Sequence, residues 1–452
     1  MIRPDGTEET WEYDGEGNCT RHTDPNGAST GYTYTHFDLL AARHEPDGTH
    51  HEFHYDASLR LTGVVNPQGL SWSYVYDSAG RLIAETDFDG RTQRYEHDAT
   101  GRLSTRVTAA GDSIRFQRDE LGRVVAKSSG GTTTTYAYDA AGSLIRAAGP
   151  DTVLTRRYDG QGQLVAETVD GRVMTYTYDA LGRRTGRTTP SGVTSTWTYD
   201  AAGRRTALTT SGRTLTFVRD AAGREASRHI GDAVIVTSDF DTLGRTTGQE
   251  VTGPNGRRVQ RRAYRYRADD GLIGISDSED GDRDIALDVM GRVTAVQAQG
   301  WAETYAYDEF GNQTHASWPA TVPGEEANGS RSYTGTRLDA SGRVRYQHDP
   351  AGRVTLRRKK YLSRAPRTWR YSWDAENRLT QVLTPDGVTW RHTYDPLGRR
   401  TGKQRLGADG ETVVERVDFA WDHTTLVEQT TRTPGTTRPA VTLSWEYHGR
   451  RP

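Results

Sequence analysis

Residues 178–185 read YDALGRRT, and this short motif recurs along most of the chain. Further copies stand at 76–82 (YDSAGRL), 199–206 (YDAAGRRT) and 394–401 (YDPLGRRT). From Asp56 to Asp241, successive motif aspartates follow one another at intervals of 20 or 21 residues. Self-similarity at a fixed period indicates a repeat protein, in which each unit folds in the same way.

The motif has the chemistry of a tight turn followed by a strand. Asp at the first position accepts backbone N–H bonds, and Gly at the fourth takes the left-handed conformation of a type I turn. A second turn signal lies near mid-repeat, as at Asp89-Gly90, Asp170-Gly171, Ser191-Gly192 and 385–387 (Pro-Asp-Gly). Residues 174–178 alternate in the period of a strand. Each repeat is therefore predicted to fold as one β-hairpin. The expected structural turn residues are Asp77, Gly80, Arg81, Asp98, Gly101, Asp119, Gly122, Asp139, Gly142, Asp179, Gly182, Asp200, Gly203, Asp395 and Gly398.

Neighbouring hairpins are expected to pair edge to edge, because isolated hairpins are marginally stable and free edges are a liability. Pairing at constant register would place equivalent tyrosines in a ladder along one face, with cross-strand aromatic contacts of about 0.2–1 kcal/mol each. The aromatic residue two positions earlier, such as Tyr176 or Trp197, belongs to the same face. The predicted fold class is thus an all-β repeat protein, a long antiparallel β-hairpin ribbon. The expected aromatic ladder consists of Tyr76, Tyr138, Tyr158, Tyr178, Tyr199, Tyr307 and Tyr394.

Composition agrees with a thin, turn-rich β structure. Only 33% of residues are hydrophobic, the mean hydropathy is -0.81, and 49 residues are Gly. The 23 Tyr and 10 Trp argue against disorder, since disordered chains are poor in aromatics. A net charge of -2 does not indicate wholesale nucleic-acid binding, and no stretch is apolar enough for a membrane span. Cys19 is the only cysteine, so no internal disulfide can form.

The repeat pattern is interrupted in three places. After Asp241 the next expected anchors are Asp269 and Asp288. The segments 253–262, 319–330 and 357–366 are read as loops or enlarged turns, and none resembles a hinge between globular domains. The sequence therefore predicts a single repeat region over residues 1–452, with about twenty repeats and no further domain.

The chain resembles the Rhs/YD-repeat family from Tyr13-Asp14 to about Trp421-Asp422. The resemblance implies a ribbon that spirals into a hollow or partial shell. It also implies a role in encapsulating the C-terminal toxin of a polymorphic toxin, and a relationship to teneurins and toxin-complex proteins. The expected partners are a toxin polypeptide or the rest of a larger Rhs-type protein. Complete members carry a core-terminal cleavage region, which this sequence lacks, so a shell fragment or a truncated product is expected.

Other residue clusters are candidate sites. Asp395-Pro396-Leu397-Gly398 is similar to the family's cleavage motif but keeps the register of a repeat turn, as does 349–352. His50 and His54 would share a strand face, but their spacing matches no established metal-ligand set. The acidic run 277–284 is interpreted as a solvated hairpin loop and not as a calcium loop. Two basic clusters are interpreted as solvated loops. They are Arg257, Arg258, Arg261 and Arg262, and Arg357, Arg358, Lys359 and Lys360.

The sequence favours a non-enzymatic scaffold without a cofactor, since no catalytic motif such as a nucleophile elbow or P-loop is present. A cell-surface adhesion or carbohydrate-binding module, using aromatics such as Trp197, is the alternative. An enzyme is the third hypothesis. The N-terminal residues lack the apolar segment of a secretory signal, so an extracellular or cell-surface location would require export with a larger system.

Overall fold

The computed structural model describes residues 1–447, which form 41 β-strands and two short 3-10 helices. These residues make two compact units. The first unit contains Met1–Thr92, Thr216–Tyr346 and Lys359–Arg364, and the second contains Gln93–Leu215, Gln347–Arg358 and the described residues from Ala365 onward. The antiparallel hairpin ribbon predicted from the sequence is confirmed in each unit.

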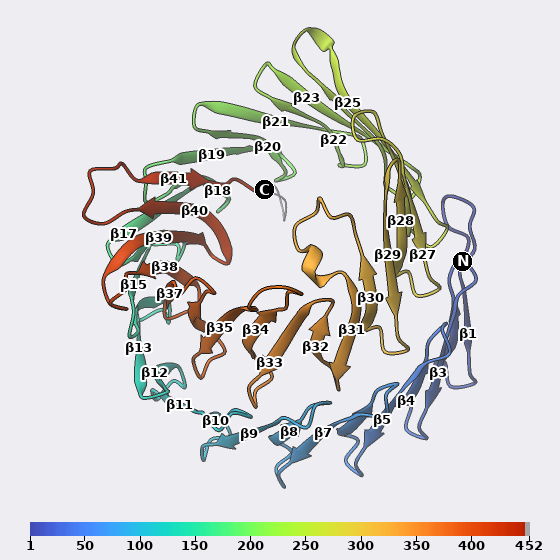
Figure 1. Ribbon diagram of the computed structural model, residues 1–452, viewed down its shortest axis with the longest axis horizontal. Helices are drawn as coiled ribbons and strands as arrows, with labels where there is room; N and C mark the ends of the chain where they lie inside the picture. Colours follow the sequence, from blue (N-terminus) through green and yellow to red (C-terminus); the bar gives the residue numbers. More distant parts are fainter. Residues whose placement is uncertain (448–452) are drawn as a thin grey trace. The chain divides into compact units, whose positions relative to one another are not determined.

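In the first unit, each strand pairs antiparallel with its chain neighbours. Figure 1 shows its first eight strands in blue. These are β1 Thr10–Tyr13, β2 Cys19–Thr23, β3 Ser29–Tyr34, β4 Leu40–His44, β5 His50–Tyr55, β6 Leu61–Val65, β7 Ser71–Tyr76 and β8 Leu82–Thr86. The later ones are β22 Glu225–Ile230, β23 Val234–Phe240, β24 Thr246–Thr252, β25 Arg258–Tyr266, β26 Leu272–Asp277, β27 Arg283–Leu287, β28 Val293–Ala298, β29 Trp301–Tyr307, β30 Gln313–Ser317, β31 Gly329–Thr334 and β32 Arg337–Ser341. The helices are η1 Pro254–Gly256 and η2 Glu325–Ala327.

The second unit follows the same rule of consecutive antiparallel pairing. Its first strands are β10 Leu103–Val107, β11 Ser113–Arg118, β12 Val124–Ser129, β13 Thr132–Tyr138, β14 Leu144–Ala148, β15 Val153–Tyr158, β16 Leu164–Val169, β17 Arg172–Tyr178, β18 Arg184–Thr188, β19 Thr194–Tyr199 and β20 Arg205–Thr210. Its last strands are β35 Arg367–Trp373, β36 Leu379–Leu383, β37 Thr389–Tyr394, β38 Arg400–Leu406, β39 Val413–Asp422, β40 Thr425–Arg432 and β41 Val441–Ser444. Strands β9 Thr92–His97, β21 Arg213–Arg219, β33 Val344–His348 and β34 Val354–Lys359 each contain a unit boundary.

A bulge recurs at the tyrosine of the motif. In the pair β17–β18, Thr177 faces Gly186, but the register shifts before Tyr178, which faces Arg184. The same shift precedes Tyr76, Tyr138 and Tyr199. A bulge re-aims a side chain and increases the local twist. The repeat therefore places each tyrosine in the same way at the start of each turn.

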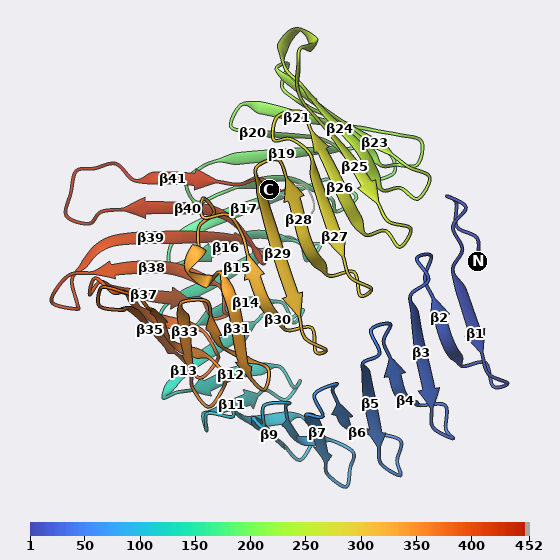
Figure 2. The same cartoon turned by 45° about the vertical axis from the view of Figure 1, so that its right-hand side comes forward.

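Buried apolar side chains gather in the second unit, where two groups of strands lie face to face. In Figures 1 and 2, strands β15–β18 and β38–β40 lie side by side. Met174 and Tyr176 of β17 pack with Ala420 of β39 and Val427 of β40 in one buried cluster. Elsewhere the ribbon is largely half-buried, which agrees with its low hydrophobic content. The second unit thus contains a two-layered region.

The interrupted segments differ in part from the prediction. Residues 258–262 are strand and not loop, because β25 extends the pairing with β24 as far as Arg258. Residues 357–359 likewise complete β34, and 329–330 begin β31. Polar side chains on a two-sided ribbon do not prevent strand pairing, since a half-exposed face accepts them.

The anchor expected at Asp269 is also corrected. The backbone N–H of Arg267 donates to the carbonyl of Gly271, as the anchor aspartate does elsewhere. Asp270, with φ 70°, takes the place of the motif glycine. Asp269 instead binds the Arg267 guanidinium at 2.7 and 2.5 Å. The turn therefore keeps its geometry with an arginine in the place of the anchor aspartate.

Candidate functional site

The motif aspartate organises each turn through both of its carboxylate oxygens. Oδ1 of Asp179 accepts the backbone N–H groups of Leu181 and Arg183, each at 3.0 Å. Oδ2 accepts Nε of Arg183 at 2.7 Å. Burial raises the pKa of Asp179, but the hydrogen bonds from Arg183 and Leu181 outweigh it and hold the pKa below its ordinary value. The charged form of the carboxylate is therefore the one that holds the turn.

The predicted turn residues occupy equivalent places. Each of the seven aspartates accepts the backbone N–H of the residue four positions later. Each of the seven glycines has a φ between 77° and 86°. This conformation costs non-Gly residues energy, which explains the glycine of the motif. Arg81 donates Nε to its own aspartate at 2.7 Å.

A second set of contacts joins each repeat to the next. The guanidinium of Arg183 lies 4.9 Å from the centre of the Tyr199 ring and donates to the carbonyl of Asp200 at 3.2 Å. In return, the Tyr199 hydroxyl donates to the carbonyl of Arg184 at 2.6 Å. Arg and Tyr of successive repeats thus form a reciprocal clasp of one cation–π contact and two hydrogen bonds.

The seven ladder tyrosines all make the hydroxyl half of this clasp, each to a carbonyl 14 or 15 residues earlier. An arginine covers the ring in five of them, which are Tyr76, Tyr138, Tyr199, Tyr307 and Tyr394. Tyr158 and Tyr178 follow repeats in which Ser143 and Gln163 replace the arginine. Arginine, and not a neighbouring tyrosine, is therefore the partner of the covered rings.

The clasp requires a hydrogen-bond donor more than it requires tyrosine. Trp373 and Trp421 stand at the tyrosine position and donate Nε1 to the equivalent carbonyls, at 2.8 and 2.7 Å. Arg118 does the same through its guanidinium at 3.2 Å. The sequence reading assigned the arginine to its own turn and missed its role across repeats. The signal was present, since Arg follows Gly in most copies of the motif.

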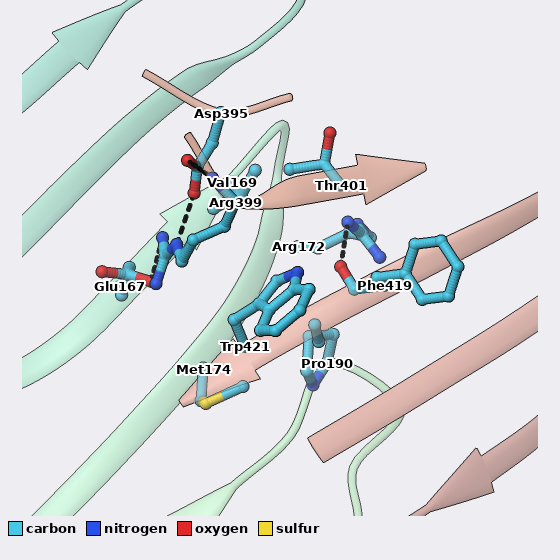
Figure 3. Close-up of a pocket in the computed structure, with 11 residues that line it drawn as sticks. Glu167, Val169, Arg172, Met174, Pro190, Asp395, Arg399, Thr401, Phe419 and Trp421 are labelled. Atoms are coloured by element: carbon cyan, nitrogen blue, oxygen red, sulfur yellow. Dashed lines mark hydrogen bonds and ion pairs between the residues drawn. The ribbon is translucent and has the colours of Figure 1, made fainter. Parts of the chain in front are cut away.

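A buried polar pocket lies in the second unit, between β16–β17 and β38–β39 (Figure 3). Arg399 donates to Asp395 at 2.6 Å and to Glu167 at 2.8 Å, and Glu167 also accepts Nε of Arg156 at 2.8 Å. Arg172 donates to the carbonyl of Phe419 at 2.9 Å. The cavity volume is about 20 Å³, which is room for about one water molecule. The pocket is therefore too small for a substrate, and its carboxylates Glu167 and Asp395 are paired with arginines.

Asp395 of the sequence Asp-Pro-Leu-Gly is fully engaged in this network. It is 1% exposed, and it accepts the backbone N–H groups of Leu397 and Arg399. The carbonyl of Pro396 accepts the hydroxyl of Tyr136 at 3.3 Å. Burial, with a smaller contribution from Glu376, raises the pKa of Tyr136 to about 12, so its proton is retained at neutral pH. These contacts give Asp395 the role of a turn anchor.

The remaining candidate clusters have separate structural partners. His50 and His54 both approach Glu52, at 3.3 and 3.7 Å, and no group of three metal-binding side chains exists among residues 1–447. Asp277 was expected in a solvated loop, but it is only 5% exposed. Its Oδ2 lies 2.6 Å from Nε of Arg262. The acidic run and the first basic cluster therefore meet in an ion pair whose carboxylate is buried.

Comparison with known proteins agrees with this repeat geometry. The Teneurin YD-shell family matches residues 70–224, and the RHS Repeat family matches residues 3–28, 13–50 and 373–412. The chain thus contains repeats of the RHS and teneurin YD-shell type. Its relatives include the probable deoxyribonuclease RhsA of Dickeya dadantii, 30% identical over 170 residues. The match covers 38% of this Rhs/YD-repeat chain and 11% of that relative.

A second relative is the double-stranded DNA deaminase toxin A of Burkholderia cenocepacia, 30% identical over 181 residues. This match covers 38% of the YD-repeat chain and 12% of the relative. The chain thus spans about a tenth of the length of these curated relatives.

Solved structures of toxin complexes share the fold. A crystal structure of TcdB2-TccC3-Cdc42 matches 96% of this chain with a TM-score of 0.69 and 14% identity, over 29% of its own length. The Tc holotoxin pore of Photorhabdus luminescens matches 96% with a TM-score of 0.66 and 14% identity, over 28% of its length. The described residues contain no helix long and apolar enough to cross a membrane.

Proposed function

We propose that this chain is a non-catalytic scaffold segment of a toxin-carrying YD-repeat protein, and that it surrounds a toxin polypeptide. The observation that carries the proposal is the clasp between successive repeats. It fixes each hairpin to the next through Tyr and Arg, which suits a continuous wall. The toxin names of the relatives and the Tc-toxin fold support the same role. We further propose that the protein acts outside the cell or at its surface after export with a larger system.

The chemistry of the buried pocket agrees with a structural role. Asp395 and Glu167 are paired with Arg399 and Arg156, and the cavity admits about one water molecule. An active site needs a reacting group that can reach a substrate. The carboxylate of Asp395 is instead occupied by two backbone N–H groups and one guanidinium.

The alternative function, glycan binding, was expected to use Trp197, which is buried in the structure. Trp197 is 5% exposed, and the guanidinium groups of Arg187 and Arg205 lie 5.7 and 5.2 Å from its ring centre. A sugar needs an open aromatic face for stacking. A glycan surface would therefore have to use other aromatics, such as Tyr13, which is 62% exposed.

The enclosure proposal is tested by fusing a small reporter ribonuclease after the full chain and treating the fusion with protease. We expect the reporter to resist digestion under conditions that degrade the free domain within minutes. The matched control is the same fusion with Glu167→Leu, which weakens the second unit and is expected to expose the reporter. Digestion of the reporter at the rate of the free domain would contradict the proposal. Glycan-array binding by the unfused chain would favour the alternative.

A further inference from the structure

A cluster of arginines in the second unit has more positive charge than its carboxylates neutralise. Arg172 begins β17, Arg416 lies on β39, Arg432 ends β40, and Arg438 lies in the loop that follows. These four side chains line one cavity of about 590 Å³ together with Asp170 and Asp418. Four guanidinium groups and two carboxylates leave a formal charge of +2 in the cavity.

The strand register brings two of these arginines directly opposite each other. Arg416 pairs with Arg432 in the antiparallel ladder of β39 and β40, and Asp418 pairs with Thr430 on the same side. Like charges directly opposite one another destabilise a sheet. Asp418 relieves this only in part, because its carboxylate accepts Nε of Arg416 at 2.7 Å and lies 3.8 Å from Nε of Arg432.

The carboxylate of Asp170 also has a hydrogen-bond partner. Oδ1 of Asp170 accepts the backbone N–H of Val153 at 2.9 Å. Arg172 donates to the carbonyl of Phe419, which is neutral. Burial lowers the pKa of Arg172, and the positive charges of Arg416 and Arg432 lower it further against the opposing effect of Asp418. Within the described residues, no carboxylate forms an ion pair with Arg438.

We propose that this cavity is a binding site for a phosphate-bearing anion. Four guanidinium groups from four segments can surround a tetrahedral oxyanion, and the planar fork of arginine matches phosphate oxygens bidentately. The cavity volume lies within the range of small-molecule sites, so it has room for a polyphosphate or an organic phosphate. The bound anion would remove the repulsion between Arg416 and Arg432. This site goes beyond the proposed scaffold role and does not depend on it.

The test uses the full chain in buffer of low ionic strength, with inorganic pyrophosphate as the probe and citrate as a carboxylate of similar charge. We expect pyrophosphate to bind in calorimetry and to raise the melting temperature. Citrate should bind more weakly, since a planar carboxylate cannot meet guanidinium groups from several sides as a tetrahedral phosphate can. Arg432→Gln is expected to weaken pyrophosphate binding by about tenfold, the loss of one charge-assisted contact. The same variant should melt at a higher temperature than the parent chain without anion, because the facing positive charge is gone.

Arg438→Gln, which lies in an exposed loop, is the second variant and should weaken binding without changing the melting temperature of the anion-free protein. The matched control is Arg213→Gln, an exposed arginine at the start of β21, which should bind as the parent chain does. Unchanged pyrophosphate affinity in both Arg432→Gln and Arg438→Gln would overturn the proposal. Equal affinity for citrate and pyrophosphate would overturn the selectivity for phosphate.

Discussion

His392 on β37 is a buried histidine held between cationic side chains. It is 9% exposed, and its Nδ1 lies 3.4 Å from the guanidinium of Arg400, so this nitrogen accepts the hydrogen bond. Burial lowers the pKa of His392 to about 4, with further contributions from the positive charges of Arg400 and Lys403. The folded protein therefore holds this imidazole neutral, whereas the unfolded chain takes up a proton near its ordinary pKa of about 6.5.

This difference predicts a pH dependence of stability. Between about pH 6.5 and pH 4 the unfolded state binds one proton more than the folded state, so stability falls as the pH is lowered through this window. Above about pH 6.5, the imidazole of His392 is neutral in both the folded and the unfolded state, so it no longer makes stability depend on pH. His392→Gln removes the titration, so the variant should lose less stability than the parent chain between pH 7 and pH 4.5 in urea unfolding. Parallel pH profiles of the two proteins would contradict the assignment.

At the scale of the hairpin, stability depends on contacts between successive repeats. The ribbon has few deeply buried apolar residues, so each hairpin relies on its neighbours. Turn formation is local, but the Arg–Tyr clasp spans one repeat and links the turn of one hairpin to the strand of the next. In a repeat protein such nearest-neighbour terms add up along the chain.

Two copies in which the arginine is absent allow a direct test of the clasp. Gln163→Arg should place a guanidinium over the Tyr178 ring and stabilise the second unit by about 0.5–1 kcal/mol, the value of a partly exposed cation–π contact. Arg183→Gln is the matched reverse change, and it should destabilise by at least as much because it also removes the ion pair with Asp179. Urea unfolding measures both. Equal stability of Arg183→Gln and the parent chain would show that the clasp contributes nothing.

At the scale of the whole molecule, the second unit also depends on contacts between segments far apart in sequence. Glu167 and Arg399 are 232 positions apart and pair at 2.8 Å with almost no exposure of either side chain. Glu428 accepts the hydroxyl of Ser191 across 237 positions. Breaking a buried pair leaves an uncompensated charge, which costs more than the pair itself contributes.

Glu167→Leu is therefore expected to destabilise the second unit by about 3 kcal/mol, because Arg156 and Arg399 lose a shared carboxylate. Hydrogen exchange measures the effect by segment. We expect amides of 153–178 and of 394–422 to lose protection together. Loss confined to 153–178 would show that the two segments are not energetically coupled. Glu303→Leu, on β29 of the first unit, is the control and should leave these amides unchanged.

The sequence alone determined the repeat, the turns and the pairing of neighbouring hairpins. These features depend on residues within a few positions of one another, such as Asp179, Gly182 and Arg183, so a periodic pattern reveals them. Even the Arg–Tyr clasp could have been predicted, since it joins fixed positions of successive copies. The anchor at Arg267 could also have been found, because Tyr266 keeps the register of the motif.

Only the tertiary structure decided which distant segments meet. The pair Glu167–Arg399 joins segments 232 positions apart. The pair Asp277–Arg262 and the facing arginines Arg416 and Arg432 follow from the register of neighbouring strands and not from spacing in the motif. Every repeat carries similar charged side chains, so sequence periodicity cannot distinguish the few that become buried. Burial is decided by the face that each strand presents to another layer, and a one-residue change of register would reverse it.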